Sequence, residues 1–170
     1  MPSNIEIKAR ARNFEEIRAR AANLSDTAVQ VIFQEDTFFQ TPHGRLKLRI
    51  LSDHAELIYY TRPDQNGPKR SDYHLTRSHD PENLKRVLDL AYGIRGVVKK
   101  TRYLYLVGQT RVHLDDVDAL GQFMELEVVM QDGQSDAEGQ AIAEGLISAL
   151  GVERSDLIEG AYMDLLEKNV

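Results

Sequence analysis

The chain has 170 residues, 42% hydrophobic and 28% charged, so it is long enough for a folded domain and too apolar to be disordered. Its net charge of −6 and pI of about 5.4 disfavour binding to nucleic acids or to anionic membranes. The absence of cysteine excludes disulfides, thiolate catalysis and cysteine-based zinc sites.

No apolar run approaches the roughly 20 residues that span a bilayer. The N-terminal stretch "MPSNIEIK" lacks the apolar core of a signal peptide. We therefore expect a cytoplasmic protein with one domain over residues 1–170 and no membrane partner.

The first predicted element is a strand over residues 4–10, in which apolar and charged residues alternate. Asn13 is a typical N-cap, and Glu15 and Glu16 follow in the first turn, which predicts a helix over about residues 14–24. The next four expected elements are strands over residues 29–39, 45–51, 54–62 and 70–77.

A second helix is predicted by "HDPENLKRVLDLAYG". Asp80 is its cap, Pro81 takes the first helical position, and Gly93 ends it. Three further strands are expected over residues 95–106, 109–117 and 122–130.

A third helix is predicted after Ser135, which forms a capping box with Glu138, and it ends at Gly151. Ser155 is expected to cap a last short helix that carries "IEGAYMDLLEK". The connections between the strands, such as "TPHG", "SDH" and "DALG", are short and favour antiparallel hairpins.

The polar faces of the predicted strands are almost purely ionic, whereas a solvated face usually mixes Thr, Ser, Gln, Lys and Glu. The cations on these faces are Lys8, Lys47, Arg49, Arg62, Lys100, Arg102 and Arg111. The acids are Glu6, Asp115, Glu125 and Glu127. Eight antiparallel strands can close a barrel. We therefore predict an α+β fold: a closed eight-stranded antiparallel barrel with helices packed outside and the ionic faces inside.

So many buried charges need compensation. The lysines and arginines call for a polyanion, and the paired glutamates call for a hard divalent cation such as Mg²⁺ or Mn²⁺. A metal-bound polyphosphate satisfies both requirements. The five histidines show no metal-binding spacing, so each of them, His113 included, is interpreted as structural.

The opening "NIEIKAR" resembles the E-x-E-x-K signature of the CYTH superfamily, the triphosphate tunnel metalloenzymes. The resemblance continues through "DTFFQTPHGRLKLR", "YYTRPD", "VVKKTRYLY", "RVHLDDVDALGQFMELEV" and "AYMDLL", and so covers nearly the whole chain in order. It implies a tunnel-shaped barrel and an enzyme that acts on a triphosphate with Mg²⁺ or Mn²⁺.

The resemblance also implies roles for individual residues. The implied metal ligands are Glu6, Glu125 and Glu127, assisted by Asp115. The implied triphosphate-binding residues are Lys8, Lys47, Arg49, Arg62, Lys69, Lys100, Arg102, Arg111 and Tyr162. Of these, Lys8, Arg49 and Arg102 are the candidate catalytic residues, and Tyr162 is expected to close one end of the tunnel. Lys69 and also Arg70, beside the "PDQNGPKR" loop, are placed to reach a phosphate or nucleoside at the mouth.

Two positions depart from the family pattern. Asn4 stands in place of the first signature glutamate, which removes one negative charge from the metal site. Phe38 and Phe39 occupy a strand in which the family often has a tyrosine. If that tyrosine helps to activate water in hydrolytic members, this chain must orient its nucleophile in another way.

The substrate implied is a small molecule bearing a triphosphate, such as ATP, thiamine triphosphate or tripolyphosphate. Attack by water on the terminal phosphorus would make the chain a triphosphatase, which we favour because it asks less of the site. Attack by a ribose hydroxyl on the α-phosphorus would make it an adenylyl cyclase, with Tyr60, Tyr73 and Phe123 available to stack on a base. A non-catalytic module that binds nucleotide or polyphosphate is a third reading, and the chain is expected to be a monomer or homodimer.

Overall fold

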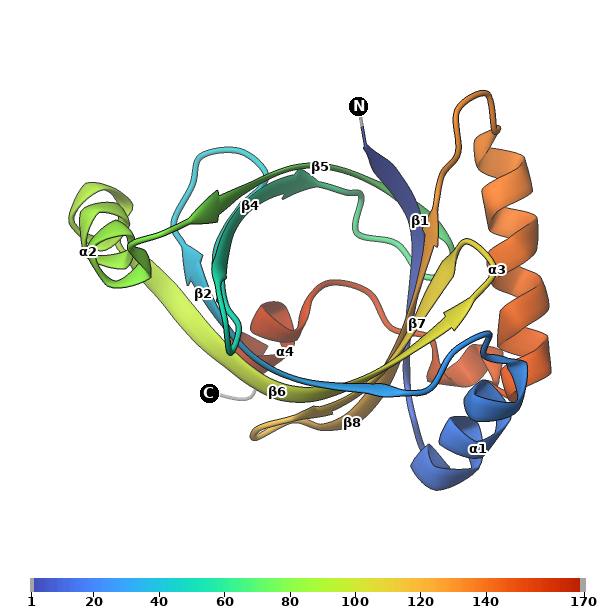
Figure 1. Cartoon of the computed structure of the whole chain (residues 1–170). Helices are drawn as coiled ribbons and strands as arrows, with labels where there is room; N and C mark the ends of the chain where they lie inside the picture. The colour runs from blue at the N-terminus through green and yellow to red at the C-terminus, as the bar shows by residue number, and fades with distance from the viewer. Residues whose placement is uncertain (1, 169–170) are drawn as a thin grey trace.

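Eight strands form the body of the protein in a computed structural model, which describes residues 2–168 (Figure 1). They are β1 (Ser3–Arg10), β2 (Gln30–Phe39), β3 (Arg45–Ile50), β4 (Ala55–Thr61), β5 (Lys69–Ser78), β6 (Ile94–Val107), β7 (Thr110–Val117) and β8 (Gly121–Val129). All eight predicted strands are confirmed, with each end within one residue of its prediction.

The strands close into an antiparallel barrel in the order β1-β5-β4-β3-β2-β6-β7-β8. β1 completes the ring because it pairs with β5 along one edge and with β8 along the other. Sequence neighbours pair as hairpins through most of the chain, as the short connections predict. The predicted closed barrel is thereby confirmed.

Four α-helices and one 3₁₀-helix accompany the barrel. They are α1 (Phe14–Leu24), α2 (Pro81–Tyr92), α3 (Asp136–Leu150), the 3₁₀-helix η1 (Arg154–Asp156) and α4 (Tyr162–Lys168). Within residues 2–168, no helix is both long and apolar enough to cross a membrane.

The predicted caps of α2 and α3 are confirmed. Asp80 Oδ1 accepts a hydrogen bond of 3.2 Å from the backbone N–H of Asn83. In α3 the Ser135 hydroxyl accepts from the N–H of Glu138 at 3.2 Å, and the Glu138 carboxylate accepts from the N–H of Ser135 at 2.7 Å. This reciprocal pair is the capping box that the sequence predicts.

The other two predicted caps fare differently. Asn13 occupies the N-cap position of α1, as predicted, but its side chain makes no capping hydrogen bond. The cap predicted at Ser155 is wrong. Ser155 lies inside η1, and α4 begins only at Tyr162. The first turn of α4 is instead held by Asp164, whose Oδ2 accepts from the N–H of Ala161 at 2.7 Å.

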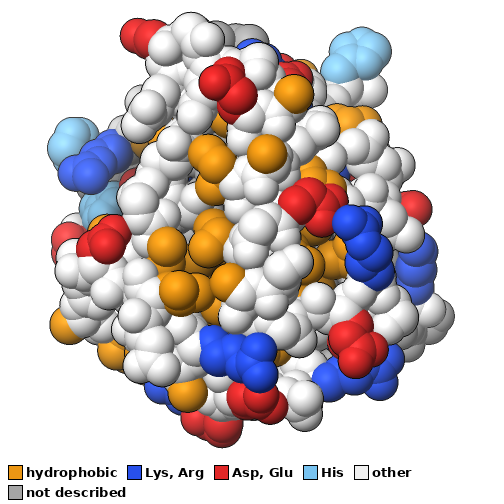
Figure 2. All heavy atoms as spheres, turned by 90° about the vertical axis from the view of Figure 1, so that its right-hand side faces the viewer, with side chains coloured by type: hydrophobic (Ala, Val, Ile, Leu, Met, Phe, Trp, Pro, Cys, Tyr) orange, Lys and Arg blue, Asp and Glu red, His pale blue; other side chains and the backbone are white. Residues whose placement is uncertain are grey.

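The main apolar core lies outside the barrel, between its wall and helices α1 and α3. Alternate residues of β1, β7 and β8 point outward here, because successive side chains of a strand point to opposite faces. The outward face of each of these strands supplies apolar side chains to the core. The buried members of this core include Ile5, Ile7, Leu114, Leu126, Phe14 and Ile147. Figure 2 shows this side of the molecule, where apolar atoms gather at the centre and charged side chains lie around them.

The short helix α4 differs from the predicted arrangement, because it lies across one end of the barrel rather than on its outer wall (Figure 1). Its residues Tyr162 and Met163 pack against Phe38, Val98 and other apolar residues of that end. Gly96 permits this approach, since a Cβ there would overlap the Met163 side chain. The barrel is therefore closed at the α4 end by an apolar plug.

Candidate active site

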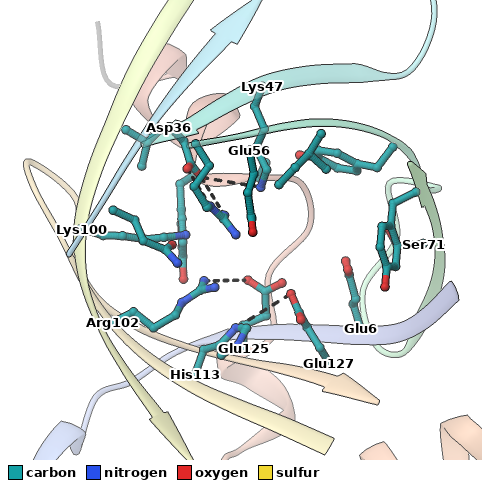
Figure 3. Close-up of a pocket in the computed structure, with 18 of the residues that line it drawn as sticks. Glu6, Asp36, Lys47, Glu56, Ser71, Lys100, Arg102, His113, Glu125 and Glu127 are labelled. Atoms are coloured by element: carbon teal, nitrogen blue, oxygen red, sulfur yellow. Dashed lines mark hydrogen bonds and ion pairs between the residues drawn. The ribbon is translucent and has the colours of Figure 1, made fainter. Parts of the chain in front are cut away.

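A cavity of about 290 Å³ occupies the interior of the barrel (Figure 3). That volume is near the lower end of the range for small-molecule sites, roughly 300–1,000 Å³. The cations that line it are Lys8, Lys47, Arg49, Arg62, Lys100, Arg102 and Arg111. The acids that line it are Glu6, Asp36, Glu56, Glu125 and Glu127. The ionic strand faces therefore point inward, as the alternation predicts.

Two lysine–arginine pairs are each anchored by one buried aspartate. In the first, Arg49 donates from Nε and an Nη to the two carboxylate oxygens of Asp36, both at 2.8 Å, and Lys47 Nζ lies 3.6 Å from the same carboxylate. Burial would raise the pKa of Asp36, but Arg49 and Lys47 outweigh it and hold that pKa far below its usual range.

In the second pair, Arg102 donates to both oxygens of Asp115 at 2.8 Å, and Lys100 Nζ lies 3.8 Å away. The Tyr162 hydroxyl also donates to Asp115, at 2.8 Å, which ties α4 to this group. Each aspartate carries one charge and contacts two cations. With all four cations protonated, each group keeps a net positive charge facing the cavity.

Burial, together with the neighbouring arginines, lowers the pKa values of the two lysines. Burial, followed by the nearby Arg49, lowers the pKa of Lys47 to about 8. Burial and the neighbouring Arg102 lower the pKa of Lys100 to about 7. A bound polyanion would reverse both shifts, because it stabilises the charged ammonium groups.

The acidic wall of the cavity carries Glu125 and Glu127 on β8 beside His113 on β7, across the barrel from the Asp36 group (Figure 3). It adjoins the Asp115 group, since an Arg102 Nη lies 4.0 Å from Glu125. Lys8 Nζ lies 3.3 Å from Glu125, and an Arg111 Nη lies 2.7 Å from Glu127. Burial would raise the pKa of Glu127, but His113 and Arg111 outweigh it and hold that pKa at about 2. Both glutamates are therefore carboxylates at neutral pH.

A divalent cation fits this wall. The ligand atoms of His113, Glu125 and Glu127 all lie within 4.8 Å of one another. Carboxylate oxygens are the donors that Mg²⁺ and Mn²⁺ accept in proteins. The Asn4 Oδ1, which lines the same cavity, is buried without a hydrogen-bond partner in the described chain. The donor set is therefore suitable for a metal.

Glu6 lies in the same cavity but outside this compact cluster. Its carboxylate accepts from Arg62 at 2.9 Å, and Arg62 also donates to the carbonyl of Gly160 at 3.0 Å. Burial, reinforced by repulsion from Glu125, raises the pKa of Glu6. A cation placed between the two glutamates would relieve that repulsion.

The cavity brings together most of the predicted site residues. Two do not line it. Asp115 is fully buried behind Arg102, with its oxygens already accepting from Arg102 and Tyr162. Lys69 is also buried, and its Nζ donates to the carbonyl of Gln65 at 3.1 Å. Tyr162 lies at the closed end, with its ring 3.9 Å from Lys8 Nζ.

Three further residues line the cavity although the sequence did not single them out as site residues: Asp36, Glu56 and His113. Alternation would have found Asp36 and His113, since Asp36 shares a face with Phe38 and His113 shares one with Arg111. His113 has no second histidine or cysteine at a ligand spacing, so the sequence does not mark it as a metal ligand. Its acidic neighbours, Glu125 and Glu127, lie on a different strand, and spacing within one segment cannot reveal a contact between strands.

This closed barrel, whose cavity is lined by seven cations and a cluster of acids, has the architecture of the triphosphate tunnel proteins. The CYTH domain model matches residues 3–162, and the chain therefore belongs to the CYTH family. A relative from Methanocaldococcus jannaschii, named "putative adenylate cyclase", is 23% identical over 95% of this chain and 97% of its own length.

Solved structures share the fold. The PH1012 protein of Pyrococcus horikoshii matches with a TM-score of 0.85 and 25% identity, covering 95% of this chain and 98% of its own. A Hippeastrum protein, described as a "putative adenylyl cyclase" with a dominant triphosphatase activity, matches with a TM-score of 0.71 over 99% of this chain and 96% of its own. Its identity is 13%, so that likeness concerns the fold.

Proposed function

We propose that the chain is a divalent-metal-dependent enzyme that hydrolyses a triphosphate bound inside its barrel. The observation that carries this proposal is the pair of aspartate-anchored cation groups that share one cavity with Glu125 and Glu127. Such an arrangement is complementary to a phosphate chain that carries a metal ion. Family membership supports the same class of substrate.

In this proposal Lys47, Arg49 and Arg102 bind the phosphate oxygens. The two arginines are already oriented by their aspartates, so little reorganisation accompanies binding. Lys8, Arg49 and Arg102 neutralise the charge that develops on the transferred phosphoryl group. Lys100 and Arg62, which also line the cavity, extend the cationic surface towards the α4 end.

Glu125 and Glu127, with Glu6 nearby, would hold the metal. When bound, Mg²⁺ or Mn²⁺ supplies Lewis-acid stabilisation of the phosphate oxygens. Asp115 has a positioning role in this scheme, because it holds Arg102 and Lys100 and is not exposed to the cavity. The apolar plug around Tyr162 excludes water from the closed end.

The test is turnover of three substrates, ATP, thiamine triphosphate and tripolyphosphate, with Mg²⁺ or Mn²⁺. Phosphate, pyrophosphate and cyclic AMP are assayed separately. We expect release of phosphate, abolished by a chelator. Binding without any turnover would contradict the enzyme and favour a nucleotide- or polyphosphate-binding module.

Two variants locate the activity. Glu127→Gln should abolish metal-dependent turnover while leaving the fold intact, and Glu82→Gln on α2 is the matched control. Arg49→Ala should weaken triphosphate binding by about 1.5–3 kcal/mol, the value of a charge-assisted hydrogen bond. Arg86→Ala, on the exposed face of α2, should have no effect. Wild-type rates in both site variants would refute this assignment.

Adenylyl cyclase activity is the second candidate, supported by the apolar end of the cavity. Ile32, Leu51, Leu75 and Leu104 line it away from α4, together with Tyr73. Such a surface suits a base or another flat organic group, whereas tripolyphosphate offers nothing to contact it. Pyrophosphate released together with cyclic AMP would establish the cyclase in place of the triphosphatase.

A further inference from the structure

His113 is a buried polar residue whose role the packing does not explain. It lies on β7, faces the cavity and is only 3% exposed. Its Nδ1 has no hydrogen-bond partner among the described residues. The nearest carboxylate oxygen, Oε1 of Glu127, is 3.9 Å away, which is too long for a hydrogen bond.

Leaving such an atom unsatisfied costs about 1–3 kcal/mol, so buried polar atoms without partners are rare and call for an explanation. Here the ring stands next to two carboxylates, and one ligand atom from each of the three side chains lies within 4.8 Å of the others. Two ligands of one ion, each at about 2.1–2.2 Å, can lie up to about 4.4 Å apart. A small closure of these side chains brings all three within reach of a single ion.

We infer that His113 is a nitrogen ligand of the metal site, together with Glu125 and Glu127, and that it makes the site favour a first-row transition ion such as Mn²⁺ over Mg²⁺. Mg²⁺ strongly prefers oxygen ligands, whereas imidazole binds transition ions more readily. This inference rests on the proposed metal site and identifies the kind of ion that it takes.

Asn4 supports the same conclusion. Its amide oxygen lines the same cavity without a hydrogen-bond partner among the described residues, and it brings no negative charge to the metal wall. A nitrogen donor contributes through ligand type instead of charge, and transition ions accept such a donor more readily than Mg²⁺ does.

His54 provides a contrast within the same chain. Its Nδ1 lies 2.7 Å from Asp53 and its Nε2 lies 3.0 Å from Glu56, so carboxylates satisfy both ring nitrogens without an ion. His54 therefore serves as the control for His113. Each can be replaced by glutamine, which keeps a polar side chain.

The experiment is electron paramagnetic resonance of Mn²⁺ bound to the full chain, with and without tripolyphosphate. Continuous-wave spectra give the affinity, and pulsed spectra detect coupling to a ligand ¹⁴N. The wild type and His54→Gln should both show nitrogen coupling. His113→Gln should lose it and bind Mn²⁺ about 10–100-fold more weakly, while its affinity for Mg²⁺, from competition, changes less than about threefold.

Oxygen-only coordination in the wild type, both with and without tripolyphosphate, would overturn the inference, and so would retention of the coupling in folded His113→Gln. If His113→Gln does not fold, the Mn²⁺ spectra of His113→Asn and of the wild type test the inference instead. Nitrogen coupling without triphosphate turnover would support the ligand while refuting the proposed activity. Triphosphate turnover with oxygen-only Mn²⁺ would refute the ligand alone.

Discussion

At the residue scale, two buried aspartates fix the positions of the cations inside the barrel. Asp36 and Asp115 each fix an arginine through two hydrogen bonds and hold a lysine nearby. Planar guanidinium groups suit this bidentate geometry. The result is a set of cations whose positions are set before any ligand arrives.

Asp115→Asn tests this organisation. Within residues 2–168, Asp115 is the one acid that lies within 4.0 Å of both Arg102 and Lys100, and breaking a buried pair costs about 3–5 kcal/mol. We expect urea denaturation to show a loss of that size in the free energy of unfolding. Asp116→Asn, at the exposed next position of β7, is the control, and an equal loss in both variants would contradict the role given to Asp115.

Lys47 gives the site a pH dependence. Burial lowers its pKa from 10.5 to about 8, so above that pH the folded protein loses a proton that the unfolded chain keeps. The contribution of this group to stability therefore rises between about pH 8 and 10.5 in the unliganded protein. Triphosphate binding has the opposite trend, because the ligand requires the charged ammonium.

Binding of tripolyphosphate should accordingly weaken as pH rises through about 8. Lys47→Arg stays charged, so the ratio of its affinity to that of the wild type should grow by up to about tenfold per pH unit above that point. Isothermal titration calorimetry at several pH values measures both. Parallel pH profiles for the two proteins would show that Lys47 does not contact the phosphates.

At the element scale, alternation made the strands predictable. β1, β3, β7 and β8 each have one mainly apolar face and one mainly ionic face, so their orientation follows from a period of two. The pattern is weaker in β2, β5 and β6, where apolar residues such as Ile32, Leu75 and Leu104 also line the cavity. The helix ends were less predictable. Asn13 and Ser135 are both favourable cap types, yet only Ser135 makes the capping hydrogen bond, because residue type does not fix the side-chain rotamer.

These two positions give a matched pair of variants. Ser135→Ala should lower the free energy of unfolding by about 0.5–2 kcal/mol, since it breaks the capping box of α3. Asn13→Ala should change it by less than about 0.5 kcal/mol, because that side chain makes no cap hydrogen bond. Denaturation curves for both proteins provide the measurement, and a larger effect at Asn13 would be inconsistent with the structure.

The placement of α4 was partly predictable. Tyr162 was expected at one end of the tunnel, and it is found there, buried in the apolar plug. The sequence places the start of this helix too early, at Ser155, because the segment before α4, residues 157–161, is irregular and is held by contacts to the barrel. One of these is the hydrogen bond from the N–H of Ile158 to the carbonyl of Lys8 at 2.9 Å.

At the scale of the whole molecule, an acidic protein lines an interior cavity with seven of its 21 lysines and arginines. The net charge of −6 gives no sign of an anion site, whereas the faces of the individual strands do. Alternation shows which side chains point inward, but the partner of each depends on strand order and register. Lys8 meets Glu125 because β1 lies beside β8, and Arg62, which follows β4, meets Glu6 of β1 over the intervening strand β5. Neither contact follows from spacing along the chain.

The most direct test of the account is a crystal structure of the protein with tripolyphosphate and Mn²⁺, using anomalous scattering to locate the ion. We predict the phosphate chain inside the barrel, in contact with Arg49 and Arg102, and the manganese peak at Glu125 and Glu127. A phosphate chain and ion bound on the outer surface, with the interior ion pairs unchanged, would contradict it.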